Sequence, residues 1–246
     1  MRTYTDRELP NLLRSAFFAL ALLLLTPPYS IAALMTVVLP RQARWRIISG
    51  WAHCVIWLAR VLLGISYRVE GLQHLPGSPA VILSKHQSAW ETIAFQIIFP
   101  PHVHVLKKEL LWIPFFGWGL ALMSPIAIDR GRGSRALRQM AEQGAARLAQ
   151  GFCILVFPEG TRVSPGTTGN YRVGGAWLAV RTGAPVIPVA HNAGHYWGRN
   201  AFTKRPGEIR VVIGEAIASE GLTPELLNAK VKAWIEAQSA SLCPAP

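Results

Sequence analysis

Two short clusters in this sequence combine residues that do acid–base chemistry with residues that bind anions. The first is the segment 85–92, Lys-His-Gln-Ser-Ala-Trp-Glu-Thr, directly after an apolar run. His86 and Glu91 are offset by about 140° on one straight helix, so they do not share a helix face. They can meet if His86 lies in a turn and Glu91 in the first turn of the next helix. A carboxylate on one imidazole nitrogen would then leave the other nitrogen free to take a proton.

Glu91 also has a purely structural interpretation. Ser88 and Glu91 have the spacing of a capping box, in which the Glu91 carboxylate bonds the backbone N–H of Ser88 at the start of a helix. Spacing alone does not separate this role from the catalytic one, so both stay open.

The second cluster is the segment 157–162, Phe-Pro-Glu-Gly-Thr-Arg, which also follows an apolar run. Strand ends in α/β sheets are where ligand-binding groups gather. Gly160 permits close backbone approach, and Arg162 offers a planar fork that matches a phosphate. The alternative is an ordinary Glu-Gly turn with a solvated arginine.

These clusters belong to an apolar and basic chain. Hydrophobic residues make up 51% of the 246 residues and charged residues only 15%, yet the net charge is +12. Such an excess of cations suits an anionic partner, which includes nucleic acid, an anionic bilayer and phosphorylated substrates. The three cysteines, Cys54, Cys153 and Cys243, are widely spaced and indicate neither a disulfide framework nor a zinc knuckle. The motifs of serine hydrolases, nucleoside triphosphatases and dinucleotide enzymes are absent.

From residue 69 onward, short β-rich runs alternate with helical stretches, which predicts an α/β fold with a mixed or mostly parallel sheet flanked by helices. Expected strands cover residues 79–84, 102–106, 125–128, 152–157, 186–190 and 209–213. Expected helices cover residues 88–98, 134–150, 174–182 and 224–238. His102 and His104 share a face of one strand, but no third ligand is evident, so no metal site is expected.

Residues 1–68 differ from the rest and are expected to form a membrane-embedded helical segment, before the α/β domain at 69–246. No charged residue occurs between Ser15 and Pro40. Pro27 and Pro28 each remove a backbone donor and are expected to break this stretch into halves too short to span a bilayer. Arginines on both flanks favour the cytoplasmic side, so the segment is predicted to enter and return. A spanning anchor is the alternative.

Four sequence blocks together resemble the 1-acyl-glycerol-3-phosphate acyltransferase family. They occur in the expected order over roughly residues 70–215. The blocks are His-Gln-Ser-x-x-Glu at 86–91, the segment 106–117, Ile-Asp-Arg at 128–130, and Phe-Pro-Glu-Gly-Thr-Arg at 157–162. One block alone is weak, whereas the ordered set is specific. The resemblance implies a glycerolipid-acyltransferase-like fold and direct acyl transfer from acyl-CoA or acyl-carrier protein to the sn-2 hydroxyl of lysophosphatidate, giving phosphatidate.

The resemblance also implies roles for single residues. His86 matches the catalytic histidine, and Glu91 occupies the position of its acidic partner, where most members carry Asp. Lys85 stands where Asn is common and is given no role. The positions that match the substrate-binding residues are Lys107, Arg130, Glu159, Gly160, Thr161 and Arg162. No cofactor is expected, because the thiolate of the donor is a good leaving group.

Other functions remain possible at this point. The same chemistry could act on a lyso-ornithine lipid, glycerol phosphate or another lysophospholipid, and a catalytically silent protein could use the basic surface to bind membranes. Nucleic-acid binding would need exposed basic residues with stacking aromatics, whereas most aromatics here lie in apolar runs. We therefore expect a lipid bilayer as partner and no nucleic acid, with the protein at the inner (cytoplasmic) membrane and its site facing the cytoplasm.

Overall fold

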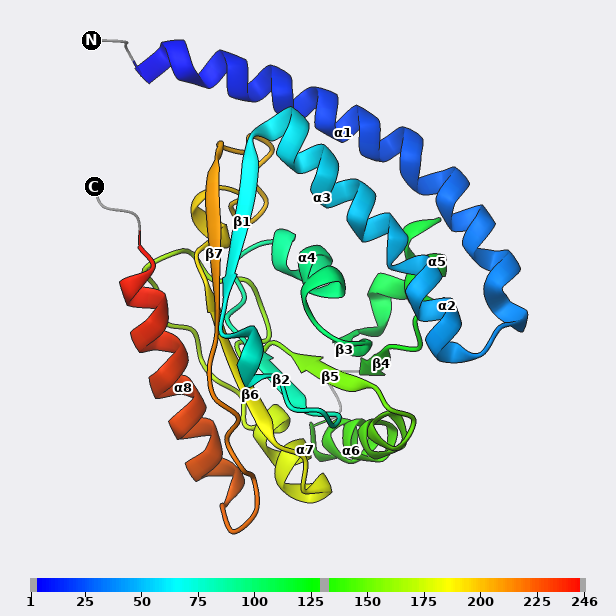
Figure 1. Cartoon of the computed structure of the whole chain (residues 1–246), viewed down its shortest axis with the longest axis vertical. Helices are drawn as coiled ribbons and strands as arrows, with labels where there is room; N and C mark the ends of the chain where they lie inside the picture. Colours follow the sequence, from blue (N-terminus) through cyan, green and yellow to red (C-terminus); the bar gives the residue numbers. More distant parts are fainter. Residues whose placement is uncertain (1–3, 129–132, 244–246) are drawn as a thin grey trace.

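The computed structural model describes residues 4–128 and 133–243 as a mixed, mostly parallel sheet flanked by helices (Figure 1). The strands are β1 (Ile65–Glu70), β2 (Val81–Ser84), β3 (His102–Lys107), β4 (Ile126–Ile128), β5 (Cys153–Val156), β6 (Val186–His191) and β7 (Gly207–Ile213). The helices are α1 (Tyr4–Leu34), α2 (Arg41–Ile48), α3 (Gly50–Leu63), α4 (Trp90–Ile98), α5 (Phe116–Leu122), α6 (Gly133–Ala149), α7 (Gly174–Thr182) and α8 (Pro224–Ser241). The expected fold class is confirmed.

The sheet has the strand order β1-β7-β6-β2-β5-β3-β4. Neighbouring strands are parallel except for β6 and β7, which are antiparallel. The central strands β2 and β5 are buried along their whole length. Because β2 and β5 are parallel neighbours, their carboxyl ends lie at the same edge of the sheet. The two polar clusters of the sequence directly follow these ends.

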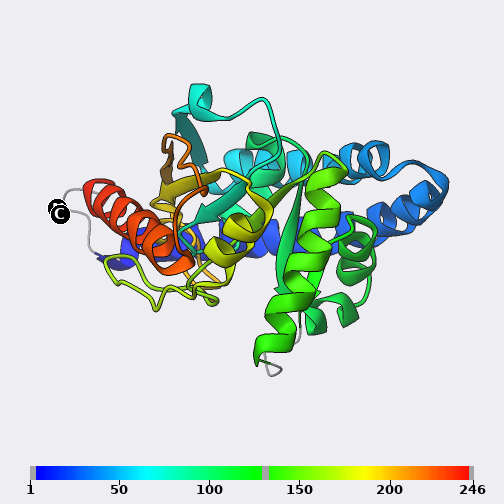
Figure 2. The ribbon, with the colours of Figure 1, turned by 90° about the horizontal axis from the view of Figure 1, so that it is seen from below.

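Side chains alternate between two cores, as the two-residue period of a strand requires. Val81 and Leu83 of β2 point into the core that α6, α7 and α8 cover. Ile82 points to the opposite face, into the core formed with α3 and α4. Figure 2 shows α8, α7 and α6 in a row across one side of the molecule.

The N-terminal helix corrects one prediction. Helix α1 runs unbroken over 31 residues with Pro27 and Pro28 inside it, so the expected break at the proline pair is wrong. Contacts with the neighbouring helices surround this point: Trp51 Nε1 donates to Thr26 Oγ1 at 3.2 Å, and Tyr29 Oη donates to the carbonyl of Ile47 at 2.7 Å. Such tertiary contacts offset the local cost of proline, as they do in membrane helices.

Two segments, Glu8–Val38 and Arg41–Leu63, are long and apolar enough to cross a bilayer, with mean hydropathies of 1.9 and 1.3. Only 17% of the most apolar part of the first is buried within the protein. Helix α1 lies along α3 and also reaches α5 (Figure 1). The side of α1 that no other part of the protein covers is therefore strongly apolar.

The six expected strands and four expected helices all form, with ends shifted by at most three residues. Two elements were not expected. Strand β1 lies across the anticipated boundary between residues 68 and 69 and pairs with β7 in parallel. Helix α5 lies in the aromatic stretch that follows β3.

Candidate functional site

The site begins at the carboxyl end of β2, where the chain turns toward α4. Hydrogen bonds to the backbone fix this turn. Lys85 N donates to Val189 O at 3.0 Å, and the side-chain Nε2 of His191 donates to Lys85 O at 2.9 Å. Val163 N donates to His86 O at 2.8 Å from the loop that follows β5. The position of His86 is therefore set by contacts with two separate segments of the chain, β6 and the loop that follows β5.

His86 and Glu91 meet in the way that the turn-and-helix argument required. Nδ1 of His86 lies 2.9 Å from Glu91 Oε1, and the Glu91 side chain is completely buried. The same oxygen accepts the backbone N–H groups of Gln87 at 2.8 Å and Ser88 at 2.7 Å. The capping contact and the histidine contact therefore coexist, so the two interpretations of Glu91 are not alternatives in the structure.

The surroundings of Glu91 favour its ionised form. Burial acts to raise the pKa of Glu91, but the nearby His191, the bond to His86 and the N–H of Ser88 outweigh it and hold that pKa below its ordinary value. Burial lowers the pKa of His191, whose Nε2 lies 3.9 Å from Glu91 Oε1. An ionised Glu91 fixes the proton of His86 on Nδ1, which leaves Nε2 to act as a base.

Phe157 fixes the plane of the His86 ring. The two rings stack with centroids 4.0 Å apart and an angle of 16° between their planes. Phe157 directly follows β5, so the residue that opens the second polar cluster packs on the histidine of the first. The two clusters thus form one site.

A cavity of about 430 Å³ opens beside His86. Gly160, Thr161 and Arg162 line it close to His86, since Val163, directly after them, bonds His86 O. Lys107, at the end of β3, also lines it, and all four are expected substrate-binding residues. The rest of the wall is mainly apolar and includes Ala33, Ile48, Trp51, Ile93, Leu120 and Met123. The cavity thus combines cationic side chains with an apolar wall suited to a hydrocarbon chain.

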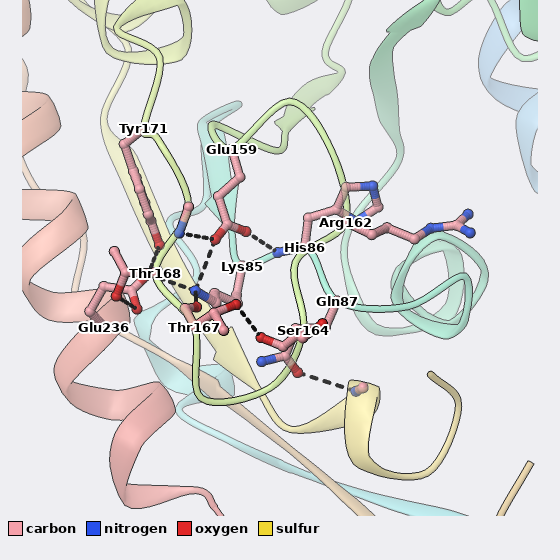
Figure 3. A network of polar contacts seen from close by, with 12 residues as sticks. Lys85, His86, Gln87, Glu159, Arg162, Ser164, Thr167, Thr168, Tyr171 and Glu236 are labelled. Carbon is pink, nitrogen blue, oxygen red and sulfur yellow. Dashed lines mark hydrogen bonds and ion pairs between the residues drawn. The ribbon is translucent and has the colours of Figure 1, made fainter. Parts of the chain in front are cut away.

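One expected substrate-binding residue is placed differently. Glu159 does not line the cavity; its side chain is fully buried, with Oε1 2.8 Å from Lys85 Nζ and Oε2 accepting His86 N at 2.8 Å. Figure 3 shows this carboxylate between Lys85 and the backbone of His86, while the His86 ring and Arg162 extend away from it. Arg130 lies outside the described residues.

Several residues of the site were missed from the sequence. Arg199 and Asn200 line the cavity, and Arg199 Nη1 donates to the carbonyl of Arg162 at 2.8 Å. Asn200 has a φ of 56°, a left-handed conformation that Asn tolerates better than most residues. Thr26 and Tyr29 bring α1 into the cavity wall. Only the basic side chain of Arg199, in a loop after a buried strand, gave any signal in the sequence.

His102 and His104 lie on the same face of β3, His102 buried and His104 half-buried. His102 and His104 have ring centroids 5.0 Å apart, and burial lowers the pKa of both. Within residues 4–128 and 133–243, no group of three or more His, Cys, Asp or Glu side chains could hold a metal ion. His104 also lines the cavity near His86.

Comparison with known proteins agrees with this geometry. The profile of the Acyltransferase family matches residues 66–192, a segment that holds both polar clusters. A 1-acyl-sn-glycerol-3-phosphate acyltransferase from Pseudomonas aeruginosa is 49% identical over 211 residues, covering 84% of this chain and 82% of its own. The chain belongs to the acyltransferase family and is an acyltransferase by this relationship.

More distant relatives share parts of the chain. The 1-acyl-sn-glycerol-3-phosphate acyltransferase alpha of Mus musculus is 33% identical over 171 residues, which are 68% of this chain and 60% of the mouse protein. The crystal structure of the 1-acyl-sn-glycerophosphate (LPA) acyltransferase PlsC from Thermotoga maritima superposes with a TM-score of 0.82 at 24% identity. It covers 98% of this chain and 99% of its own. The whole architecture, including the N-terminal helices, is therefore a known fold.

Proposed function

We propose that this enzyme transfers a fatty acyl group from acyl-CoA or acyl-carrier protein to the sn-2 hydroxyl of 1-acyl-glycerol-3-phosphate, which gives phosphatidate. The observation that carries the proposal is the His86–Glu91 pair beside a cavity that combines cationic side chains with an apolar wall. The names of the Pseudomonas and mouse relatives support the same acceptor.

The proposed reaction needs one base and no covalent enzyme intermediate. His86 Nε2 takes the proton of the sn-2 hydroxyl while the oxygen attacks the thioester carbonyl. The tetrahedral intermediate then collapses: the new ester C–O bond remains, the C–S bond breaks, and the thiolate takes the proton back from His86. Glu91 stabilises the imidazolium that exists between these two steps. Since the thiolate is a good leaving group, we propose that no cofactor is required.

Cationic side chains that line the same cavity are proposed to hold the acceptor phosphate. Arg162 has a guanidinium that can bind a phosphate through two hydrogen bonds, and Lys107 adds a second positive charge. Arg130 joins this group by the resemblance of its motif alone. Glu159 is proposed to support the loop rather than touch the substrate, because its carboxylate faces Lys85 and His86 N.

The acyl chains are proposed to reach this site from a bilayer. Large apolar side chains are exposed in the turn directly after α1, at Met35 and Val38, and around α5, at Trp112 and Trp118. Tryptophan favours the interface between lipid and water. Because α1 also contributes Thr26 and Tyr29 to the cavity wall, a helix embedded in lipid would place the cavity beside its lipid substrates. We propose location at the inner membrane with the site facing the cytoplasm, where acyl donors occur.

A panel of acceptors tests this function. Purified protein in detergent receives labelled acyl-CoA or acyl-carrier protein, with lysophosphatidate, glycerol phosphate, lyso-ornithine lipid or another lysophospholipid as acceptor. We expect phosphatidate from lysophosphatidate at the highest kcat/KM. A preference for another acceptor would retain the chemistry and refute the proposed substrate. Failure with both donors and all acceptors would indicate the non-catalytic, membrane-binding alternative.

A further inference from the structure

Lys85 is a buried cation whose hydrogen bonds are fully used. Its side chain is only 1% exposed, and Nζ contacts three acceptors: Glu236 Oε1 at 2.7 Å, Glu159 Oε1 at 2.8 Å and Thr167 O at 2.9 Å. An ammonium group has three hydrogens to donate, so this environment satisfies all of them. A lysine buried so completely is stable only with such partners.

The contact between Lys85 and Glu159 connects Lys85 to His86, the proposed base. Glu159 bonds Lys85 through Oε1 and accepts the backbone N–H of His86 through Oε2. The carboxylate thus connects the ammonium of one residue to the backbone of the next. Burial raises the pKa of Glu159, and the neighbouring Lys85 ammonium opposes that rise. Without Lys85, the ionised carboxylate that holds His86 would lose its counter-charge.

The contact between Lys85 and Glu236 connects Lys85 to the C-terminal helix, α8. Glu236 lies on α8 and accepts hydrogen bonds from Tyr171 Oη at 2.6 Å and Thr168 Oγ1 at 2.9 Å. Tyr171 and Thr168 belong to the loop between β5 and α7, residues 157–173, which also carries Arg162. Figure 3 shows Glu236 on α8 facing Lys85 and both loop residues. Glu236 therefore fastens the loop and the end of β2 to α8.

We propose that Lys85 and Glu236 are positioning residues, whose ion pair ties α8 to the loop 157–173 and, through Glu159, holds the backbone of His86 in place. The role rests on the proposed function of His86 and Arg162, since neither Lys85 nor Glu236 lines the cavity. Glu236 lies outside the segment 66–192 that matches the family. The Lys85–Glu236 ion pair, called the bridge below, is thus assigned to this chain from its own contacts.

Glu236→Gln is the primary test, because it removes the charge and keeps the size of a side chain that is still 22% exposed. Glu225→Gln on the exposed start of the same helix is the matched control. Both full-length proteins are assayed for kcat and KM with lysophosphatidate, well below their unfolding temperatures. Hydrogen–deuterium exchange of residues 157–173 reports the loop independently of turnover.

We expect Glu236→Gln to lower kcat/KM roughly ten- to a hundredfold and to speed exchange in the loop, with no change in Glu225→Gln. A lower unfolding temperature with wild-type kcat/KM would show a merely structural role and overturn the proposal. Wild-type exchange in the loop would overturn it as well. If the wild type itself failed to use lysophosphatidate, the proposed function would be wrong, and exchange alone would decide whether the bridge holds the loop.

A second variant, Lys85→Met, tests whether the two residues act as a unit. It should lower kcat/KM further than Glu236→Gln, and the double variant should lose less than the product of the two separate effects, because part of the effect of Glu236 passes through Lys85. A loss of kcat/KM in the double variant equal to the product of the two separate losses would contradict a shared role of the Lys85–Glu236 ion pair. Lys230→Met on the exposed side of α8 serves as control. If Lys85→Met does not fold, Glu236→Gln and loop exchange still decide the question.

Discussion

Replacing Glu91 by Gln separates its electrostatic contribution from its capping contribution. The amide oxygen of Gln can still accept the N–H groups of Gln87 and Ser88, which Oε1 of Glu91 now accepts at 2.8 and 2.7 Å. Oε2 of Glu91 has no hydrogen-bond partner among the described residues, so the amide nitrogen that replaces it loses no existing bond. We therefore expect Glu91→Gln to fold and to keep the start of α4 intact.

The expected loss lies in the stabilisation of the His86 imidazolium. Two unit charges about 4 Å apart attract by about 4 kcal/mol at an effective dielectric constant of about 20. The His86 side chain is 14% exposed, and its proton is only partly transferred in the transition state, so part of this attraction is realised. We expect a loss of about 2–4 kcal/mol, which corresponds to a kcat roughly 30- to 1,000-fold lower.

The assay compares kcat for wild type, Glu91→Gln and Glu91→Asp with saturating lysophosphatidate, and circular dichroism verifies folding. Glu91→Asp keeps the charge but shortens the side chain by one methylene group, so we expect it to retain more activity than Glu91→Gln. A kcat for Glu91→Gln within threefold of wild type would reduce Glu91 to a helix cap. Greater activity in Glu91→Gln than in Glu91→Asp would also refute the electrostatic argument.

Further predictions concern binding, acid stability and the acyl chain. Arg162→Ala should raise the KM for lysophosphatidate more than tenfold with little change in kcat, whereas an unchanged KM would remove Arg162 from the phosphate site. Burial lowers the pKa of His102 from 6.5 to about 4, so below pH 6.5 protons bind the unfolded chain in preference to the folded one. The free energy of unfolding should therefore fall by up to about 3 kcal/mol as the pH is lowered from 6.5 to 4. Denaturant unfolding at several pH values should show that loss reduced in His102→Gln; an identical profile would contradict it. Gly119 lines the cavity, and a Cβ there would meet only Ser30 Oγ, at 3.8 Å, so Gly119→Val should narrow the cavity and shift preference toward shorter acyl chains in a donor series. An unchanged chain-length profile would place the acyl chain elsewhere.

The sequence was most informative where local chemistry decides the structure. Apolar runs predicted the buried strands β2 and β5, and the helix expected from residue 224 begins at that residue as α8. The proximity of His86 and Glu91 could also be inferred, because only a turn followed by a helix lets residues at that spacing meet. Spacing could not show that a single carboxylate oxygen makes both the capping contact and the histidine contact.

Distant contacts account for the remaining differences. Pro27 and Pro28 stay helical because α2 and α3 bond to the helix around them, which no local rule for proline includes. Lys85 gave no functional signal because its main partner, Glu236, lies 151 positions further along the chain. The strand expected at 186–190 stops one residue short of the buried His191, which ends β6 and lies beside Glu91. Tertiary contacts of this kind become visible only once the sheet order is known.

The most direct measurement of the central claim is phosphatidate formation by wild type and His86→Ala, purified and assayed side by side with the same acyl donor and lysophosphatidate. General-base catalysis contributes roughly 100- to 10,000-fold, so we expect the rate of His86→Ala to fall by at least that lower factor. Sedimentation with vesicles should be the same for both proteins, because His86 lies inside the cavity. A folded, vesicle-binding His86→Ala with a rate within tenfold of wild type would contradict the assignment of His86 as the base.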